Sequence, residues 1–479
     1  MPRLIPVVAL GLWFTSCGPG AAGTSGTESA GGSTSEASTA TAGPTTSTSS
    51  SESTSLPGSD SSEPESDTDT HPWCNCLIGA QRECEVCGKS GVQTCDWYDA
   101  DACDYGPCEL VEDGDPCPAG QECVGEYCEW LQPLRACERQ AMTSSELTFA
   151  GPASTVALAD FDDDGVLDLL AALPVDKGVE LRFGDGAGGF GPGAVFPTGM
   201  SSGASRMAIA DLNGDGRPDV VSTAPSAVGE LSLVVNQGGV FAAPLVSTLG
   251  AEPQQLFAGD FDGDGLVDVL ARSTPVLAEL AFRTGDGMGG VGPEVVLDES
   301  AVAVFPIGAG KVAGGQQVDI VSTAHDPQGA EILELVDGAL KRVATITGHG
   351  EVRYQEVAVG DIDGDGTKDV ALYREVPSLA MVRAWAQGVN EELSLPWKGQ
   401  LGPIADVDGD GRGDLLIATA GPPGLGVVYF AASCVQDYVL ANATSEAGLA
   451  SGDIDGDGKA DVVVATVGSS QAIVLRTGP

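Results

Sequence analysis

One nonapeptide recurs six times in the chain and constrains the fold more than any other feature. Its pattern is Dx[DN]xDGxxD, and the copies begin at Asp160, Asp211, Asp260, Asp361, Asp406 and Asp453. The intervals between these first aspartates are 51, 49, 101, 45 and 47 residues. The interval of 101 holds two periods, with a degenerate copy that ends at Asp319. A period of roughly 49 residues therefore predicts a repeat architecture of seven units.

Each copy of the motif lies between two short runs of β-favouring residues. In the first repeat TVALA (155–159) precedes the motif and LDLLAAL follows it. Two further runs follow in most repeats, and four strands per repeat are typical of a propeller blade. The last repeat stops after its third strand, whereas ELTF (146–149) is an unassigned strand before the first motif. We expect this N-terminal strand to complete the last blade and to close the ring, which removes an open sheet edge.

The aspartates of the motif predict a calcium site in each copy. Three side chains at alternate positions and a fourth at position nine converge on one ion when Gly at position six turns the chain. Oxygen ligands without His or Cys select a hard cation, and a flexible loop with several carboxylates favours Ca²⁺ over Mg²⁺. The predicted ligands are Asp160, Asp162, Asp164 and Asp168; Asp211, Asn213, Asp215 and Asp219; Asp260, Asp262, Asp264 and Asp268; Asp361, Asp363, Asp365 and Asp369; Asp406, Asp408, Asp410 and Asp414; and Asp453, Asp455, Asp457 and Asp461.

The fourth repeat is the exception. Back-counting from Asp319 with a small gap places Gly308, Gly310 and Val312 where carboxylates are needed, so we expect no ion there and about six Ca²⁺ ions in all. Asn213 replaces one acid in the second site, which lowers the charge of that site. EF-hands and dockerin repeats share parts of the nonapeptide, but both need helical flanks, and an EF-hand also needs a twelfth-position Glu.

These motifs and their period resemble the FG-GAP or VCBS-type repeats of integrin α chains and of many secreted bacterial proteins. The resemblance covers about 152–479. It implies an all-β fold, a seven-bladed β-propeller with calcium-binding loops, and ligands at motif positions one, three, five and nine.

The charge of the chain excludes nucleic acid as a partner. The 479 residues include 69 Asp and Glu but only 22 Lys and Arg, which gives a formal net charge of -47. Binding to a polyanion needs clustered Lys and Arg. Cations are the expected small partners, and their binding to the crowded aspartates links metal to folding.

The first 16 residues have the features of an export signal. Arg3 precedes an apolar stretch at 4–14 that is too short to span a bilayer. The segment before Cys17 resembles the lipobox of bacterial lipoproteins, although Phe14 stands where Leu is usual. That resemblance implies lipidation of Cys17 and an exported outer-membrane or cell-surface lipoprotein, with a periplasmic or secreted protein as the alternative. Residues 17–72 are rich in Ser, Thr and Gly and predict a disordered tether.

Residues 73–137 predict a small disulfide-rich module. Eleven cysteines lie between Cys74 and Cys137, and in an exported chain this density indicates disulfides rather than a zinc site. Eleven is odd, and Cys434 is the only other cysteine besides Cys17. We therefore predict a long-range bridge to Cys434, with Cys137 as its best partner, and leave the other pairings open. The propeller is assigned to 138–479.

The sequence contains few candidate catalytic residues. The chain has three histidines, and Gly199–Gly203 fits GxSxG but lies between blades rather than at a strand-to-helix elbow. Arg412-Gly413-Asp414 spells an integrin-binding tripeptide, but Asp414 is a predicted metal ligand. We expect a binding or adhesion propeller that recognises protein or glycan and contacts the membrane only through its lipid. A polysaccharide lyase or hydrolase and a structural envelope spacer are the alternatives.

Overall fold

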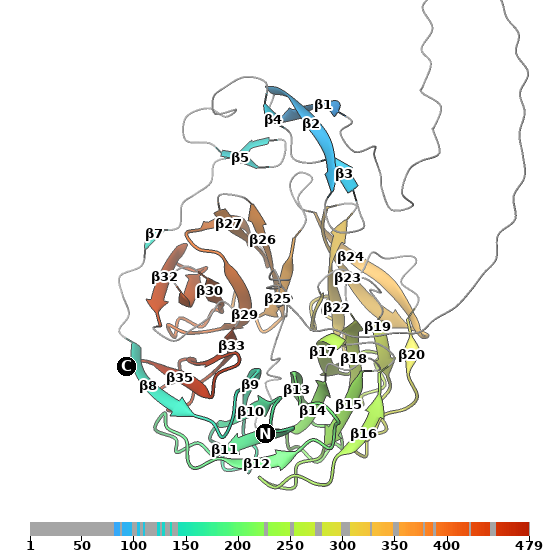
Figure 1. Cartoon of the computed structure of the whole chain (residues 1–479), viewed down its shortest axis with the longest axis vertical. Helices are drawn as coiled ribbons and strands as arrows, with labels where there is room; N and C mark the ends of the chain where they lie inside the picture. The colour runs from blue at the N-terminus through green and yellow to red at the C-terminus, as the bar shows by residue number, and fades with distance from the viewer. Residues whose placement is uncertain are drawn as a thin grey trace, which may run out of the picture. The chain divides into compact units, whose positions relative to one another are not determined.

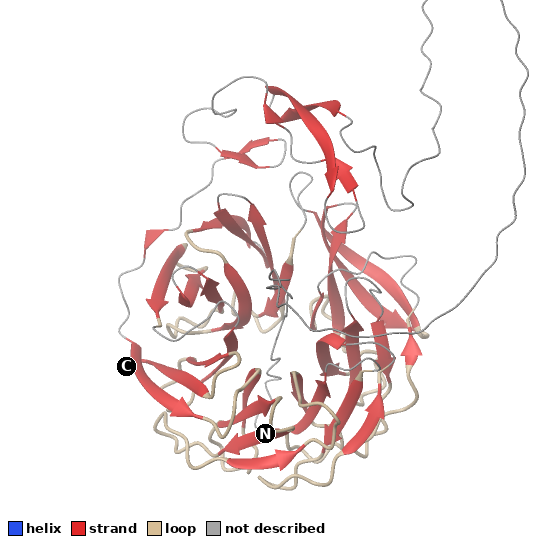
Figure 2. Ribbon diagram, in the orientation of Figure 1, coloured by secondary structure: helices blue, strands red, loops and turns tan. Residues whose placement is uncertain are grey.

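The computed structural model describes the propeller region in most of its length and the preceding region in part. The described ranges are 81–86, 89–97, 103–105, 109–110, 122–124, 127–129, 135–136, 142–224, 229–249, 253–273, 280–297, 307–325, 328–347, 354–376, 379–386, 389–420, 423–440 and 447–478. The predicted signal, the tether, Cys17 and Cys137 lie outside these ranges. Strands are the only regular elements that the described residues form (Figure 2), and among them no helix is long and apolar enough to cross a membrane.

Packing divides the chain into two compact units, and all strands from β5 onward belong to the larger one. Its described residues form seven sheets that follow the repeats, six with four antiparallel strands and one with five strands. In Figure 1 they surround a common centre, as expected for a propeller. Sheets one to four are β9 (Thr155–Ala159), β10 (Asp168–Leu173), β11 (Gly178–Arg182) and β12 (Ala194–Pro197); β13 (Arg206–Ala210), β14 (Asp219–Ala224), β15 (Glu230–Val234) and β16 (Leu245–Thr248); β17 (Pro253–Gly259), β18 (Asp268–Ser273), β19 (Leu280–Arg283) and β20 (Val295–Val296); and β21 (Ile307–Gly310), β22 (Asp319–His325), β23 (Gln328–Val336) and β24 (Ala339–Thr347).

The remaining three sheets follow the same strand order. They are β25 (Glu356–Gly360), β26 (Asp369–Val376), β27 (Leu379–Ala386) and β28 (Val389–Leu395); β29 (Gly399–Ala405), β30 (Asp414–Ala420), β31 (Pro423–Tyr429), β32 (Cys434–Val439) and the additional β7 (Arg135–Ala136); and β33 (Ala447–Gly452), β34 (Asp461–Thr466), β35 (Gln471–Thr477) and β8 (Met142–Thr148). Because each motif joins the first strand of a sheet to the second, all the motif loops lie at corresponding ends of the sheets.

The N-terminal strand completes the last sheet, as the sequence predicts. β8 pairs antiparallel with β35 along its whole length. Two side chains of the first sheet then hold the chain that leaves β8: Arg182 donates from Nη2 to the Thr148 carbonyl at 2.6 Å, and Glu180 Oε2 accepts the Ala150 N–H at 2.6 Å. Glu180 is only 1% exposed and also pairs with Arg182. The first and last sheets are therefore joined by side-chain hydrogen bonds from Arg182 and Glu180 to the backbone of Thr148 and Ala150.

The sixth sheet carries a fifth strand that comes from the end of the predicted cysteine-rich module. β7 pairs parallel with β32, and Ala136 lies opposite Val435. Cys434, the first residue of β32, is disulfide-bonded. The outer edge of this sheet is thus covered by the chain segment that directly precedes Cys137, the bridging partner predicted from the sequence.

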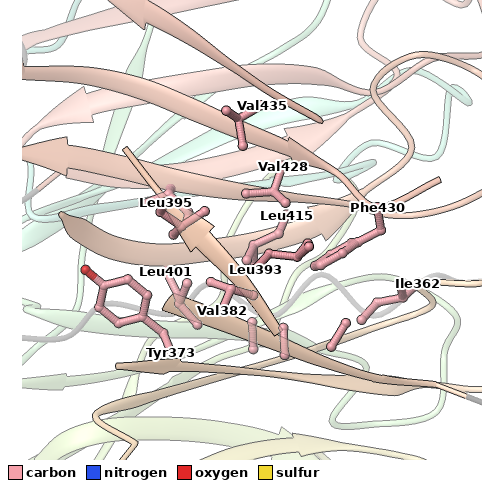
Figure 3. Packing of buried hydrophobic residues seen from close by; sticks show 14 of the residues in the cluster. Ile362, Tyr373, Val382, Leu393, Leu395, Leu401, Leu415, Val428, Phe430 and Val435 are labelled. Atoms are coloured by element: carbon pink, nitrogen blue, oxygen red, sulfur yellow. The ribbon is translucent and has the colours of Figure 1, made fainter. Parts of the chain in front are cut away.

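The hydrophobic core consists of clusters between neighbouring sheets. Figure 3 shows the cluster between the fifth and sixth sheets, to which the buried side chains of Tyr373, Val382 and Leu415 belong. Polar side chains add links from one sheet to the next: the Gln255 side chain donates to the Ile307 carbonyl and accepts its N–H, and Glu356 Oε2 accepts the Leu401 N–H at 2.6 Å. Burial raises the pKa of Glu356 to about 8.

The region before the propeller forms short strands. A small sheet consists of β1 (Gln81–Val86), β2 (Lys89–Trp97), β3 (Cys103–Tyr105) and β4 (Glu109–Leu110). A separate hairpin of β5 (Glu122–Val124) and β6 (Tyr127–Glu129) places Cys123 opposite Cys128. Short strands of this kind are expected for a small module that lacks a large core.

Candidate metal centre

The first aspartate of each motif shapes the loop through the backbone. In the first loop Asp160 Oδ1 accepts the N–H groups of Asp163 and Asp164 at 2.8 and 3.2 Å, and its Oδ2 accepts that of Gly165 at 2.8 Å. The bond from the position-six N–H recurs in all six acidic loops, at 2.8 to 3.1 Å. The carboxylate at position one therefore folds the chain around itself and brings positions three and five toward it.

Two positions of each loop adopt the left-handed backbone region. Position six is always Gly, with φ from 87° to 90°, and position four has φ from 65° to 81°. Sequence analysis identified the turn at position six and missed the one at position four. Position four is Gly in five of the acidic loops and Asp163 in the first, where Asp tolerates this conformation better than most residues.

Substitution of Gly458 by Ala tests backbone strain alone, because an added Cβ there meets no atom within 4 Å and so causes no steric clash. We expect Gly458→Ala to lower the free energy of unfolding by about 1–2 kcal/mol and to weaken calcium binding. Gly468 is a matched control, since it also has positive φ and open space but lies in the turn after β34. Denaturant titration with and without Ca²⁺ measures both effects, and an equal loss of calcium dependence in Gly468→Ala would contradict this account.

The aspartate at position nine is a buried connector between two parts of the sheet. Its exposure is at most 5% in every repeat, and its Oδ2 accepts the N–H of position two at 2.7 to 3.1 Å. In four repeats its Oδ1 accepts a second N–H from beyond or at the end of the third strand, namely from Gly184, Asn236, Gly285 or Thr477 at 2.7 to 2.9 Å. Position two is apolar and buried in every repeat, which anchors the loop in the core. This anchor was not predicted from the sequence, although position two is apolar in every copy. Its residues are Phe161, Leu212, Phe261, Val312, Ile362, Val407 and Ile454.

The structure brings three carboxylates together in five of the six acidic motifs. Within each group the candidate ligand oxygens lie within 4.8 Å of one another. Two oxygens that each bind one Ca²⁺ at about 2.4 Å lie at most about 4.8 Å apart. The spacing of the carboxylate oxygens in these groups therefore fits this ion. The groups are Asp160, Asp162 and Asp164; Asp260, Asp262 and Asp268; Asp361, Asp363 and Asp365; Asp406, Asp408 and Asp414; and Asp453, Asp455 and Asp461.

One oxygen in the first loop lacks a partner. Asp162 Oδ1 is buried and has no hydrogen bond. Burial, and then the charges of Asp164 and Asp160, raise the pKa of Asp162 above its ordinary value. A carboxylate oxygen in this situation is stabilised by a cation, which is the observation that supports metal binding most directly.

The second loop has the same backbone but a different set of charges. Asp211 accepts the N–H groups of Gly214, Asp215 and Gly216 as in the other loops. Asn213 Nδ2 donates to Asp215 Oδ2 at 3.2 Å, and Arg217 Nη1 donates to the same oxygen at 3.2 Å. The guanidinium group thus competes with an ion for Asp215, in agreement with the lower charge expected for this site.

In the fourth loop the motif positions fall on other residues than those predicted from the sequence. Gly310 pairs with Asp319, as Gly259 pairs with Asp268 and Gly360 with Asp369, so the fourth loop has the usual length and no gap. Positions one, three and five are therefore Lys311, Ala313 and Gly315. Gly308 and Gly310 lie in β21, and Val312 is the buried anchor at position two. The assignment of ligand positions to Gly308, Gly310 and Val312 was wrong because the low similarity of this copy hid its register.

The buried aspartates predict a particular pH dependence for the metal-free protein. Burial raises the pKa of position nine to about 6 in Asp168, Asp219, Asp268 and Asp369, and to about 8 in Asp414, from 3.8. A raised pKa in the folded state contributes stability that is fully present below about pH 4 and is lost as pH rises through 6 and then 8. In EGTA we expect Tm to fall between pH 5 and pH 8. In saturating Ca²⁺ the slope should be flat or reversed, since protons compete with the ion; a falling Tm in both buffers would contradict metal binding at these groups.

Other sequence candidates have structural roles. In the GxSxG segment, Ser201 Oγ donates to Glu230 Oε2 at 2.7 Å, and the N–H groups of Ser201 and Ser202 also donate to this carboxylate. These bonds lower the pKa of Glu230 and fix the turn between two sheets. Asp414 of the Arg-Gly-Asp tripeptide is 1% exposed and lies in a three-carboxylate group, so it is directed inward as expected.

Comparison with known proteins supports the repeat assignment. Residues 160–222 and 211–271 match the FG-GAP-like repeat family. No curated protein matches the chain. Similar solved structures include BBS1N in complex with ARL6DN (12% identity, 71% of this chain and 98% of that chain covered, TM-score 0.47), the exotype rhamnogalacturonan lyase YesX (12%, 81% and 80%, 0.42) and the Dos1 propeller (12%, 68% and 79%, 0.41). The chain thus contains FG-GAP-like repeats within a propeller arrangement of sheets.

Proposed function

We propose that the protein is a calcium-stabilised seven-bladed propeller that binds a protein or glycan ligand at the cell surface. The observation that carries this proposal is the combined role of the motif aspartates. Each acidic loop uses position one to fold its own backbone, and in four of them position nine joins two parts of the sheet, so the ions support the blades rather than present a reactive centre. The loops between strands then remain available for recognition, as is usual for rigid β scaffolds.

Three carboxylates outside the motif loops have structural partners. Glu180 pairs with Arg182, Glu230 accepts bonds from the Ser201 turn, and Glu356 accepts the Leu401 N–H. Each of these groups holds neighbouring parts of the fold together. A glycoside hydrolase needs two carboxylates that face a substrate, whereas these three carboxylates bond to neighbouring parts of the fold.

A glycan array tests this proposal, with residues 18–479 as the probe so that β7 remains on the sixth sheet. We expect binding in Ca²⁺, weaker binding in EGTA, and intact glycan after incubation. Cleaved glycan would replace the binding role with a polysaccharide lyase or hydrolase. Absence of any hit, followed by absence of protein partners in surface cross-linking, would favour a structural envelope spacer.

We further propose that Cys17 is lipidated after export and that residues 17–72 hold the propeller away from the membrane. The sequence around Cys17 and the composition of the tether support this proposal. Metabolic labelling with an alkyne fatty acid should mark the wild-type chain and not Cys17→Ser. Equal labelling of both chains would exclude this anchor.

A further inference from the structure

The turn between the third and fourth strands lies at the same end of each sheet as the motif loop, because successive strands run antiparallel. In the first three sheets this turn is rich in glycine and covers 184–190, 236–241 and 285–291. An isolated bridge between its first and last residues closes each of the three turns. These compact turns therefore lie beside the motif loops.

The turn of the second sheet is hydrogen-bonded to the motif loop of the first sheet. Asn236 Nδ2 donates to the carbonyl of Phe161, the position-two residue of that loop, at 2.7 Å. Asn236 Oδ1 accepts the N–H groups of Gly238 and Gly239 at 3.1 and 2.9 Å. Asn236 is 0% exposed, so water does not compete for these bonds. One buried amide thus shapes the turn and fixes it on the loop.

Gly239 of this turn packs against the position-three ligand of the first loop. Its φ is 79°, and a Cβ added there would lie 2.7 Å from the Phe183 ring and 3.3 Å from Asp162 Cβ. Only a residue without a side chain leaves room for this approach. Asp162 Oδ1 is itself buried and without a hydrogen bond. The turn therefore closes off one side of a carboxylate that belongs to the three-carboxylate group of this loop.

The same packing recurs at the second loop. The Gly289 N–H donates to the carbonyl of Leu212, again the position-two residue, at 3.3 Å. Gly289 has φ 91°, and an added Cβ would lie 2.5 Å from Val235 Cγ2 and 4.0 Å from Asn213 Cβ. Val235 is equivalent to Phe183, because each precedes the residue whose N–H bonds to the position-nine aspartate. Two turns thus contact two loops at the same motif positions.

The corresponding turn next to the third loop is short and open. The third loop, DFDGDGLVD, closely resembles the first, DFDDDGVLD. The fourth sheet, however, joins its third and fourth strands through Asp337 and Gly338 alone, between the paired Val336 and Ala339. Gly338 also has positive φ, at 77°, but an added Cβ there meets no atom within 4 Å. Gly338 is therefore not packed against a motif loop as Gly239 is.

We propose that the turns 236–241 and 285–291 are caps that slow the release of calcium from the first and second motif loops. The proposal rests on the proposed calcium role of these loops. An ion leaves when its ligands move away from it, and a ligand packed against the next sheet moves only when the joint between the two sheets opens. The third loop lacks this restraint, so its ion exchanges faster. One chain then holds calcium ions of at least two kinetic classes.

The test is stopped-flow mixing of the calcium-loaded chain 18–479 with an excess of a fluorescent chelator. We expect wild type to release its ions in a fast and a slow phase. Gly239→Ala should speed the slow release of one ion several-fold, because the added methyl group pushes the turn away from Asp162. Gly338→Ala is the matched control, since it introduces the same backbone strain in an open turn and should leave both phases unchanged. Release of all ions in one phase, or equal effects of the two variants, would overturn the proposal.

A second variant tests the buried amide. Asn236→Asp keeps the acceptor for the N–H groups of the turn but removes the donor to the Phe161 carbonyl, so it should speed the same release. In a chain that also carries Asp162→Asn and Asp164→Asn, which removes the first site, neither Gly239→Ala nor Asn236→Asp should change the remaining phases. A change there would show that both variants act through a general loss of stability and would contradict the cap.

A measurement without metal tests the packing itself. Gly239→Ala should lower Tm in EGTA by a few degrees more than Gly338→Ala, because only Gly239 is packed at the joint between two sheets. Equal Tm values for these two variants would contradict this joint. Failure of the cap and failure of the calcium role are distinguishable: six bound ions that leave in a single phase would refute the caps alone, whereas absence of bound calcium would refute both.

Discussion

Chelation of calcium is expected to lower the Tm of the propeller by on the order of 10 °C. Without ions, five of the six acidic loops hold three carboxylates with oxygens within 4.8 Å of one another, and burial disfavours the charge at position nine. With dissociation constants of roughly 10⁻⁴–10⁻³ M, typical of extracellular calcium modules, 5 mM Ca²⁺ stabilises each site by about 1–2 kcal/mol. Six independent sites then contribute on the order of 10 kcal/mol.

The measurement is thermal unfolding in 5 mM CaCl₂, in 5 mM MgCl₂ and in EGTA at constant ionic strength. Mg²⁺ should restore little of the loss, because it requires a tighter octahedral shell than these loops offer. Asp363→Asn is a matched partial variant, since it removes one ligand of one site and should give a small part of the full effect. A Tm that is the same in Ca²⁺ and EGTA would contradict the stabilising role of the loops.

Removal of the closing strand is expected to abolish cooperative folding of the ring. β8 satisfies the whole outer edge of β35, and the chain that follows it is fixed by Arg182, Glu180 and the buried Phe149. A chain that begins at Ala150 leaves this edge open and exposes the joint between the first and last sheets. Open, apolar sheet edges pair with other chains, so we expect aggregation on expression.

A chain that begins at Met142 is the matched control, because it lacks β7 and the preceding region but keeps β8. It should fold cooperatively, with a lower Tm that reflects the loss of β7 and of any bridge to Cys434. A finer variant, Glu180→Ala, leaves the Ala150 N–H and Arg182 without their buried acceptor and should cost about 1–3 kcal/mol. Identical unfolding curves for the chains that begin at 142 and 150 would show that β8 does not close the ring.

The repeat period and the motif were sufficient to predict an all-β propeller arrangement of sheets. The spacing of the aspartates located the strands. The last repeat is one strand short, and this predicted that ELTF completes its sheet. ELTF lies in β8 except for its last residue, and β8 pairs with β35. These inferences succeed because backbone pairing requires a partner for every strand, and the sequence shows which strand lacks one. The additional β7 was not predicted, since two residues without periodicity carry no strand signal.

The acids of the site could be listed from the sequence, but their division of roles could not. Asp160 and Asp168 look alike in the motif, yet the first folds a loop and the second joins two strands beneath it. That difference depends on backbone donors such as Gly184, which is 16 residues away in sequence. The register of the fourth loop was hidden for a similar reason, because only the pairing of Gly310 with Asp319 reveals that Lys311 stands at position one.

The number of calcium ions bound per chain tests the central claim most directly. Equilibrium dialysis of residues 18–479 against ⁴⁵Ca²⁺ should be done at about 0.15 M KCl, which screens the loose attraction of calcium to the formal charge of -47. The account predicts six saturable ions, and five in a variant that carries both Asp363→Asn and Asp365→Asn. Absence of saturable binding, or a count that does not change in this variant, would contradict calcium sites in the motif loops.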